Sequence, residues 1–125
     1  MSSETLKLLQ RAEDCLSDAE ANLHLDRLNV TVNRSYYCIV DCARGLLAEM
    51  ALQPKTHQGV YVKFNELFVK NGTFSTLQRD NFRAVFELRQ SGDYDLDFEP
   101  TTENATFALE SAAEFLKATK QYLDL

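Results

Sequence analysis

The chain has 125 residues and a mass of 14.3 kDa, with 45% hydrophobic and 26% charged residues. This length and composition are typical of one compact domain, residues 1–125, and exclude a disordered or low-complexity protein. Four glycines and two prolines are few for a strand-rich fold, which needs many tight turns, so an all-α fold is expected. The net charge of −6 argues against broad, sequence-blind phosphate binding but leaves room for a small basic pocket.

The chain carries no signal for a membrane or for secretion. No apolar run approaches the roughly 18 residues that a membrane-spanning helix requires, and the first residues are too charged for a secretory signal. Its three cysteines form no CxxC pair, which favours a reducing compartment over a disulfide framework. We therefore expect a cytoplasmic protein that makes no membrane contact.

The first half of the chain predicts two amphipathic helices. From Thr5 to about Leu25, apolar residues recur every three, four or seven positions: Leu6, Leu9, Leu16, Ala19 and Leu23. The segment from Val32 to Leu52 has a wider apolar band, which extends as far as Met50. A band of this width predicts a central helix that packs against more than one neighbour.

A shorter helix follows. Pro54 disfavours helix at the residue before it, and Thr56 has a side-chain oxygen that can cap a new helix containing Val60, Phe64, Leu67 and Phe68. Asn71-Gly72 then supplies a left-handed stop.

The last part of the chain predicts two more long helices. One runs from about Ser75 to Gln90, with Leu77, Phe82, Val85 and Phe86 on its buried side, and stops at Ser91-Gly92. The acidic stretch from Asp93 to Glu99 is expected to be a solvated loop, and Thr101 can cap the final helix. The whole pattern predicts an antiparallel up-and-down four-helix bundle with one additional short helix.

Arg89 is the first candidate for a functional residue. It lies three, four and seven positions after Phe86, Val85 and Phe82, on the apolar side of its helix, so its guanidinium needs a partner. One interpretation is an ion pair with a nearby acid such as Asp93 or Asp95. The other is a phosphate clamp, which suits the planar fork of arginine.

Asn33 and Tyr37 are candidates for ligand binding. They lie one helical turn apart, so the amide of Asn33 projects beside the pair Tyr36-Tyr37 and can bond either a neighbouring helix or a ligand. Arg34 and Arg44 are expected to be solvated or ion-paired.

Lys55, Thr56 and His57 place a cation, a hydroxyl and an imidazole at a helix N-terminus. Free backbone N–H groups there favour an anion, although an ordinary capping turn explains the same residues.

Metal and cofactor chemistry is not indicated. Cys38 and Cys42 are four positions apart, but the chain has only two histidines and no other closely spaced ligands, so both cysteines are interpreted as small core residues. The acids from Asp93 to Glu99 lack the rest of a calcium-loop pattern. We expect neither a metal nor a cofactor.

Several short segments together resemble the HEPN domain family, in its small stand-alone prokaryotic branch. They are NRSYY (33–37) with ARGLL (43–47), PKTHQGV (54–60), and ELRQ (87–90) followed by DYD (93–95). The resemblance implies an up-and-down helical bundle that forms a homodimer. It also implies a partner, because such proteins are often encoded beside a minimal nucleotidyltransferase as a toxin and antitoxin pair.

Active members of the family are metal-independent RNases with an arginine, four to six residues and then a histidine. In that chemistry the histidine moves a proton and the arginine stabilises phosphate charge. Arg89 matches the arginine, but Tyr94 stands where the histidine is expected. A tyrosine with its ordinary pKa of about 10 is a poor general base at neutral pH. His57 is the one histidine inside a matching segment, and it could approach Arg89 in the bundle.

Two functions therefore stay open. In the first, the protein binds a nucleotide or RNA and a nucleotidyltransferase partner through a site that includes Asn33, Tyr37, Lys55, Arg89 and Asp93. In the second, it is a metal-independent endoribonuclease that uses Arg89 with His57 or Tyr94. The acidic net charge and the missing histidine favour the first.

Overall fold

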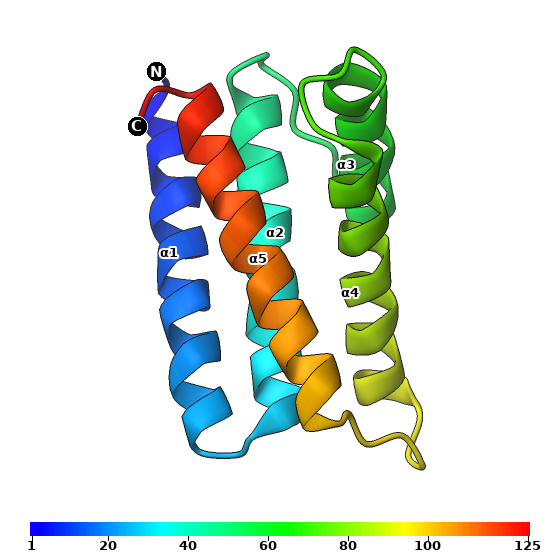
Figure 1. Cartoon of the computed structure of the whole chain (residues 1–125). Coiled ribbons are helices and arrows are strands. Elements are labelled where there is room, and N and C mark those ends of the chain that lie inside the picture. Colours follow the sequence, from blue (N-terminus) through cyan, green and yellow to red (C-terminus); the bar gives the residue numbers. More distant parts are fainter.

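Four long helices and one short one make up the fold. The computed structural model describes residues 1–125, which form α1 (Ser3–His24), α2 (Leu28–Ala48), α3 (His57–Phe64), the π-helical turn η1 (Asn65–Val69), α4 (Thr76–Tyr94) and α5 (Thr102–Tyr122). Consecutive long helices run in opposite directions, and both chain ends lie at the same end of the bundle (Figure 1). The predicted all-α, up-and-down four-helix bundle with one additional short helix is confirmed.

Local signals in the sequence set most helix ends. The hydroxyl of Thr56 accepts a hydrogen bond from the backbone N–H of Gly59 at 2.9 Å, and Ser75 and Thr101 cap α4 and α5 in the same way. Each such cap contributes about 1 kcal/mol by satisfying a backbone donor that has no partner inside its helix. Gly72 has a φ of 81°, so the predicted left-handed stop is also confirmed.

The core forms around α2, which contacts α1, α3, α4 and α5. Twenty-four buried residues form one hydrophobic cluster. Cys38 and Cys42 are fully buried within it, in agreement with their interpretation as small core residues. The central position predicted for this helix is confirmed.

The predicted ends of α2 were wrong by several residues. The helix begins at Leu28 rather than Val32, and it ends at Ala48 rather than Leu52. Ala51 adopts a left-handed conformation with a φ of 58°, and the N–H of Leu52 bonds back to the carbonyl of Leu47 at 3.0 Å. This closing turn satisfies a free carbonyl at the end of the helix and leaves Met50 exposed.

The predicted end of α4 was also wrong, because the helix continues through Gly92 to Tyr94. Gly92 allows a close approach to α2 instead of a left-handed turn: a Cβ there would lie 2.8 Å from Oδ1 of Asn29. As a result Asp93 lies on the helix, one turn after Arg89, and the loop begins only at Asp95.

Leu77 was expected to be buried, but it is 67% exposed. It precedes the buried Phe82 by five positions, which places it about 140° away around a helix of 3.6 residues per turn. Leu77 therefore lies on a different face of α4 from Phe82, and its expected burial was wrong.

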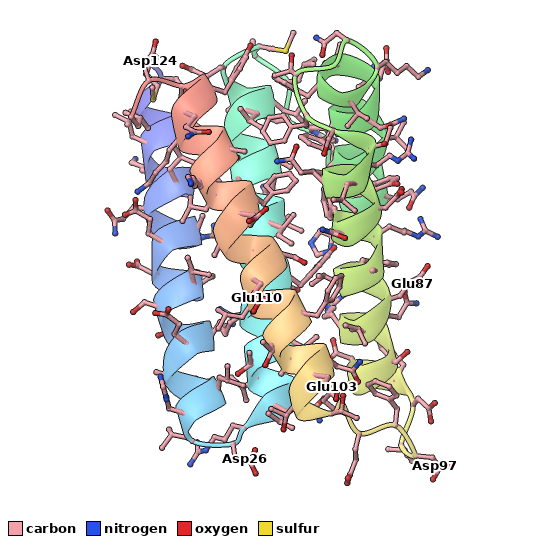
Figure 2. The ribbon with its side chains drawn as sticks, viewed as in Figure 1. Asp26, Glu87, Asp97, Glu103, Glu110 and Asp124 are labelled. Atoms are coloured by element: carbon pink, nitrogen blue, oxygen red, sulfur yellow. The ribbon has the colours of Figure 1, made fainter.

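The outer surface is strongly acidic. Asp26, Glu87, Asp97, Glu103, Glu110 and Asp124 are all exposed and lie on the outside of the bundle (Figure 2). No helix combines the length and the apolar character needed to cross a bilayer.

Candidate functional site

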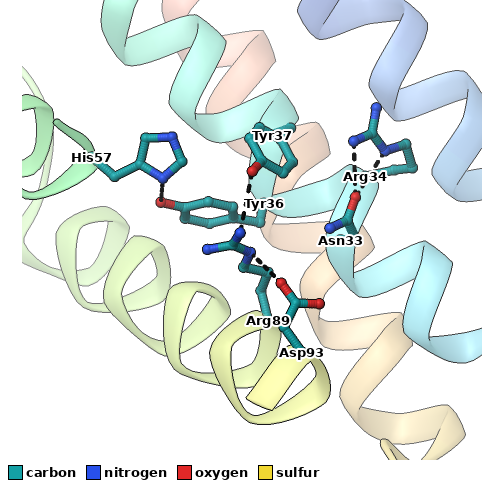
Figure 3. Close-up of polar contacts among 7 residues, drawn as sticks. All are labelled: Asn33, Arg34, Tyr36, Tyr37, His57, Arg89 and Asp93. Carbon is teal, nitrogen blue, oxygen red and sulfur yellow. Dashed lines mark hydrogen bonds and ion pairs between the residues drawn. The ribbon is translucent and has the colours of Figure 1, made fainter. Parts of the chain in front are cut away.

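Arg89 lies on the side of α4 that faces α2. Its Nη2 donates a hydrogen bond to the hydroxyl of Tyr37 at 3.3 Å, and its Nε lies 2.9 Å from Oδ2 of Asp93 (Figure 3). The Arg89 side chain is 16% exposed and that of Asp93 is 37% exposed. The predicted ion pair with Asp93 is thus confirmed. It lies at the edge of the protein, where solvent weakens it.

Two tyrosine rings hold the guanidinium of Arg89. Its Cζ lies 5.3 Å from the ring centre of Tyr36 and 5.5 Å from that of Tyr37. Such cation–π contacts contribute on the order of 0.5 to 2 kcal/mol each, with the larger values where water is excluded. They fix the plane of the guanidinium without neutralising its charge.

His57 reaches the same tyrosines from the first turn of α3. Its Nδ1 lies 3.0 Å from the hydroxyl of Tyr36, and its ring makes edge contacts with both tyrosine rings. Tyr36 therefore contacts Arg89 with its ring and His57 with its hydroxyl (Figure 3). The expectation that His57 approaches Arg89 in the bundle agrees with this arrangement.

Burial and nearby positive charge determine the protonation states of His57 and Tyr36. Burial, followed by the nearby charges of Arg89 and Arg44, lowers the pKa of His57 below its usual value, so the imidazole is neutral at pH 7. Burial raises the pKa of Tyr36 to about 12, although the charge of Arg89 opposes this. A neutral imidazole beside a protonated phenol can accept a proton, and the adjacent guanidinium can attract a phosphate.

Asn33 is joined to this cluster through Arg34. Its Oδ1 accepts hydrogen bonds from Nε and Nη2 of Arg34 at 3.0 and 2.8 Å. The guanidinium of Arg34 in turn lies 5.2 Å from the ring centre of Tyr37. Asn33 therefore orients an arginine on the far side of Tyr37 from His57 and does not itself contact Arg89.

Lys55 and Tyr94 take no part in the hydrogen bonds or ion pairs of the cluster. Lys55 is exposed, Tyr94 is 74% exposed, and neither side chain makes a hydrogen bond. Tyr94 follows Arg89 by five positions, which turns it away from the face that carries Arg89 and Asp93. The roles expected for Lys55 and Tyr94 stay predictions.

Two members of the site were missed from sequence. Tyr36 was not among the candidate site residues, although a tyrosine hydroxyl at a buried position usually needs a hydrogen-bond partner, so its residue type was a usable signal. Arg34 was expected to be solvated or ion-paired. It is instead half-buried, with no carboxylate within ion-pair distance. No pattern in the sequence indicated this.

The free space beside His57 is small. The cavity between α2, α3 and α4 measures about 10 Å³ and is lined by Tyr36, His57, Gln58, Tyr61, Phe82, Arg83 and Phe86. A volume of this size holds at most one water molecule. A larger ligand must therefore approach the cluster from the Arg89 or Arg34 side.

The fold and the site define a small all-helical bundle protein with a cationic, tyrosine-lined polar cluster between α2, α3 and α4. The family model of the HEPN domain matches residues 5–122. The chain belongs to the HEPN domain family, as the resemblance of its short segments implied.

Relatives cover nearly the whole chain. The protein named "Putative toxin MJ0142" from Methanocaldococcus jannaschii is 31% identical over 120 residues, which are 96% of this chain and 82% of the relative. A "UPF0332 protein" from Thermotoga maritima is 34% identical over 115 residues, which are 92% of this chain and 87% of the relative. The chain is thus a toxin-like HEPN protein.

A solved structure described as "Crystal structure of the toxin-antitoxin with AMP-PNP" has the same fold. The match has a TM-score of 0.67 at 14% identity and covers 96% of this chain and all of that one. At this level of identity the likeness concerns the fold alone.

Proposed function

We propose that this protein is the HEPN component of a toxin–antitoxin-type pair. In this role it binds the phosphate of a nucleotide or RNA at Arg89, and it binds a minimal nucleotidyltransferase as its protein partner. The observation that carries the proposal is the state of Arg89, a guanidinium that is largely buried, is oriented by two tyrosines and is only partly neutralised.

The hydrogen bonds of Arg89 leave it free to bind a phosphate. A guanidinium has five N–H donors. Only Nη2 makes a hydrogen bond, to Tyr37. The short distance from Nε to Asp93 reflects an ion pair whose geometry is too poor for a hydrogen bond. Nε is buried against Asp93, so a phosphate has the unpaired Nη donors, and two such donors can bond it in the bidentate geometry that arginine favours.

The names of similar proteins support the toxin–antitoxin part of the proposal. One relative is named "Putative toxin MJ0142", and the structural neighbour is described as a toxin-antitoxin with AMP-PNP. Neither name assigns a ligand or a partner to this chain, so both parts need their own test.

Binding of single-stranded RNA tests the role of Arg89. Fluorescence anisotropy with labelled RNA should give an affinity that falls about tenfold or more in Arg89→Ala, since hydrogen bonds to charged groups contribute about 1.5 to 3 kcal/mol. Arg79→Ala is the matched control, because Arg79 lies ten positions earlier on the same helix and pairs with Asp80. Equal affinities for the two variants would contradict the proposal.

The partner is tested by co-expression with a minimal nucleotidyltransferase encoded in the same genome. We expect the two proteins to elute together in size-exclusion chromatography with light scattering. The protein alone should elute as a homodimer, at twice the 14.3 kDa of the chain. Separate elution of the two proteins would remove the partner from the proposal.

Metal-independent RNA cleavage is a second candidate, and the position of His57 favours it. A neutral imidazole bonded to the hydroxyl of Tyr36 and a guanidinium packed on the ring of the same tyrosine are the two groups that such cleavage needs. Cleavage in EDTA should then be lost in Arg89→Ala and His57→Ala, with folding intact by circular dichroism. Tyr94→Phe tests the alternative use of Tyr94. No cleavage by the wild type over a broad RNA panel would leave the binding role alone.

A further inference from the structure

A larger hollow lies on the other side of Tyr37, between α1 and α2. It has a volume of about 290 Å³ and is lined by Arg11, Asp14, Cys15, Asp18, Arg34 and Tyr37. It can hold more than a water molecule, and Tyr37, which contacts Arg89, forms part of its lining.

Arg34 is the cation in this hollow that lacks a direct countercharge. Two of its nitrogens bond to Oδ1 of Asn33, and the third contacts Sγ of Cys15 at 3.7 Å. All of these partners are neutral. Arg11, which lines the same hollow, is paired instead with the buried carboxylate of Asp41 at 3.5 Å. Arg34 is therefore preorganised for an anion that the protein does not supply.

Arg34 and Arg89 are neighbours across one aromatic ring. Their Cζ atoms lie 5.2 and 5.5 Å from the ring centre of Tyr37, so their separation cannot exceed the sum of these two distances (Figure 3). Two guanidinium groups within that bound repel one another, and an anion that contacts both relieves the repulsion. The pair thus favours a ligand that carries more than one phosphate.

We propose that Arg34 and Arg89 bind two neighbouring phosphates of one ligand across Tyr37, and that the α1–α2 hollow holds the nucleoside attached to the first phosphate. This inference rests on the proposed phosphate binding at Arg89. It adds Arg34, the hollow and the order of the groups: nucleoside, phosphate at Arg34, phosphate at Arg89.

The acidic residues of the hollow can bind the nucleoside of the ligand. Asp14 and Asp18 offer carboxylate oxygens, which accept hydrogen bonds from the amino group of a base or the hydroxyls of a ribose. The same carboxylates repel phosphate, so they direct the phosphates toward Arg34 and Arg89. Two chemical sources fit two neighbouring phosphates: a nucleoside diphosphate, whose phosphates are directly joined, and a short single strand of RNA, whose neighbouring phosphates are separated by one ribose.

Isothermal titration calorimetry with AMP, ADP and the 5′-phosphorylated dinucleotide pApA tests the order of the groups. At fixed low salt, Arg34→Gln should weaken all three ligands about tenfold or more, because all three place a phosphate at Arg34. Arg89→Gln should weaken ADP and pApA about tenfold or more and AMP much less, because AMP has no second phosphate to place at Arg89. A tight complex of only ADP or only pApA identifies the source of the phosphates.

Two further variants keep the result interpretable. Arg79→Gln makes the same change in charge on α4 away from the cluster and should leave all three affinities unchanged. Arg34→Lys keeps the charge but removes the planar fork, so it should bind with intermediate affinity. Thermal unfolding by circular dichroism confirms that each variant is folded.

The outcomes separate this inference from the proposed function. If Arg34→Gln binds all three ligands with the same affinity as Arg79→Gln while Arg89→Gln binds ADP and pApA more weakly, the inference is wrong. In that case phosphate binding at Arg89 is still supported. If Arg89→Gln has no effect on any probe, the proposed function is wrong. If the wild type binds none of the three probes, both are wrong.

Discussion

Two aromatic regions of this bundle pack alike and differ in their polar atoms. The phenylalanine cluster, formed by Phe64, Phe68, Phe74, Phe82 and Phe115, has ring centres 5.1 to 6.3 Å apart. The tyrosine cluster, formed by Tyr36, Tyr37 and His57, has ring centres 5.3 to 5.7 Å apart. The first cluster has no polar side-chain atom, whereas the second has two hydroxyls and an imidazole and packs against the guanidinium of Arg89. Similar ring packing therefore stabilises the fold in one place and positions polar groups in the other.

The two clusters are connected through shared neighbours. Phe82 contacts Tyr61 at 5.4 Å between ring centres, and Phe86 contacts Tyr36 at 5.7 Å. Arg83 lies near the rings of both Tyr61 and Phe86. The tyrosine cluster is thus supported from behind by packed aromatic rings, which restrict its side chains.

The largest effect is expected in the phenylalanine cluster. Phe64→Ala removes a fully buried ring that contacts four other phenylalanines, and it should lower the free energy of unfolding by about 3 to 5 kcal/mol. Urea denaturation measures the change. Phe107→Ala is the control. Because Phe107 is 37% exposed, this substitution should lower the free energy of unfolding much less. If both variants lost the same free energy of unfolding, the phenylalanine cluster would not be the main source of stability in the core.

Replacing Arg89 should reduce ligand binding more than it reduces stability, unlike the replacement of Phe64. Arg89→Ala is expected to reduce RNA affinity by about 1.5 to 3 kcal/mol while lowering stability by about 1 to 2 kcal/mol, because it removes two cation–π contacts and a partly solvated ion pair. Anisotropy and urea denaturation on the same samples measure both quantities. A loss of stability as large as that of Phe64→Ala would mean that Arg89 is a structural residue of the core.

The hydroxyl of Tyr36 should have a smaller effect on stability. Tyr36→Phe removes the hydrogen bond to His57 and keeps the ring, so the free energy of unfolding should fall by about 0.5 to 1.5 kcal/mol. Tyr61→Phe is the control, because the hydroxyl of Tyr61 makes no hydrogen bond. ¹⁵N NMR of the imidazole should report a changed environment of His57 in Tyr36→Phe only. An identical His57 spectrum in both variants would rule out the hydrogen bond.

The smallest effect is the contribution of His57 to the pH dependence of stability. Its pKa is lower in the folded protein than in the unfolded chain, so the unfolded chain binds the proton more readily. Stability should therefore fall as the pH drops from 7 through the unfolded value of about 6.5. His57→Gln should remove this part of the slope, and His24→Gln, at an exposed position, should retain it.

The charge of Arg89 provides a direct check on the same titration. Because that charge helps to lower the pKa of His57, Arg89→Ala should raise the pKa, as measured by NMR titration. An unchanged His57 titration in Arg89→Ala would show that the two groups do not interact.

Most helix ends and the face that carries Arg89 could be predicted from sequence. The caps at Thr56 and Thr101 and the stop at Gly72 depend on contacts within one turn of the chain, so local residues determine them. Gly92 was misread, because the same residue serves a left-handed turn or a close helix approach, and only the neighbouring Asn29 distinguishes the two.

The sequence by itself determined the helical class, the apolar faces and the presence of Arg89 on one of them. Only the tertiary structure decided that Arg89 bonds to Tyr37 across 52 residues and that His57 bonds to Tyr36 across 21. The physical reason is that periodicity fixes which side of a helix a residue occupies, whereas the heights and angles at which helices pack depend on all of their side chains together. The unpaired charge of Arg34 is likewise a result of packing, because no acidic side chain comes within ion-pair distance of it.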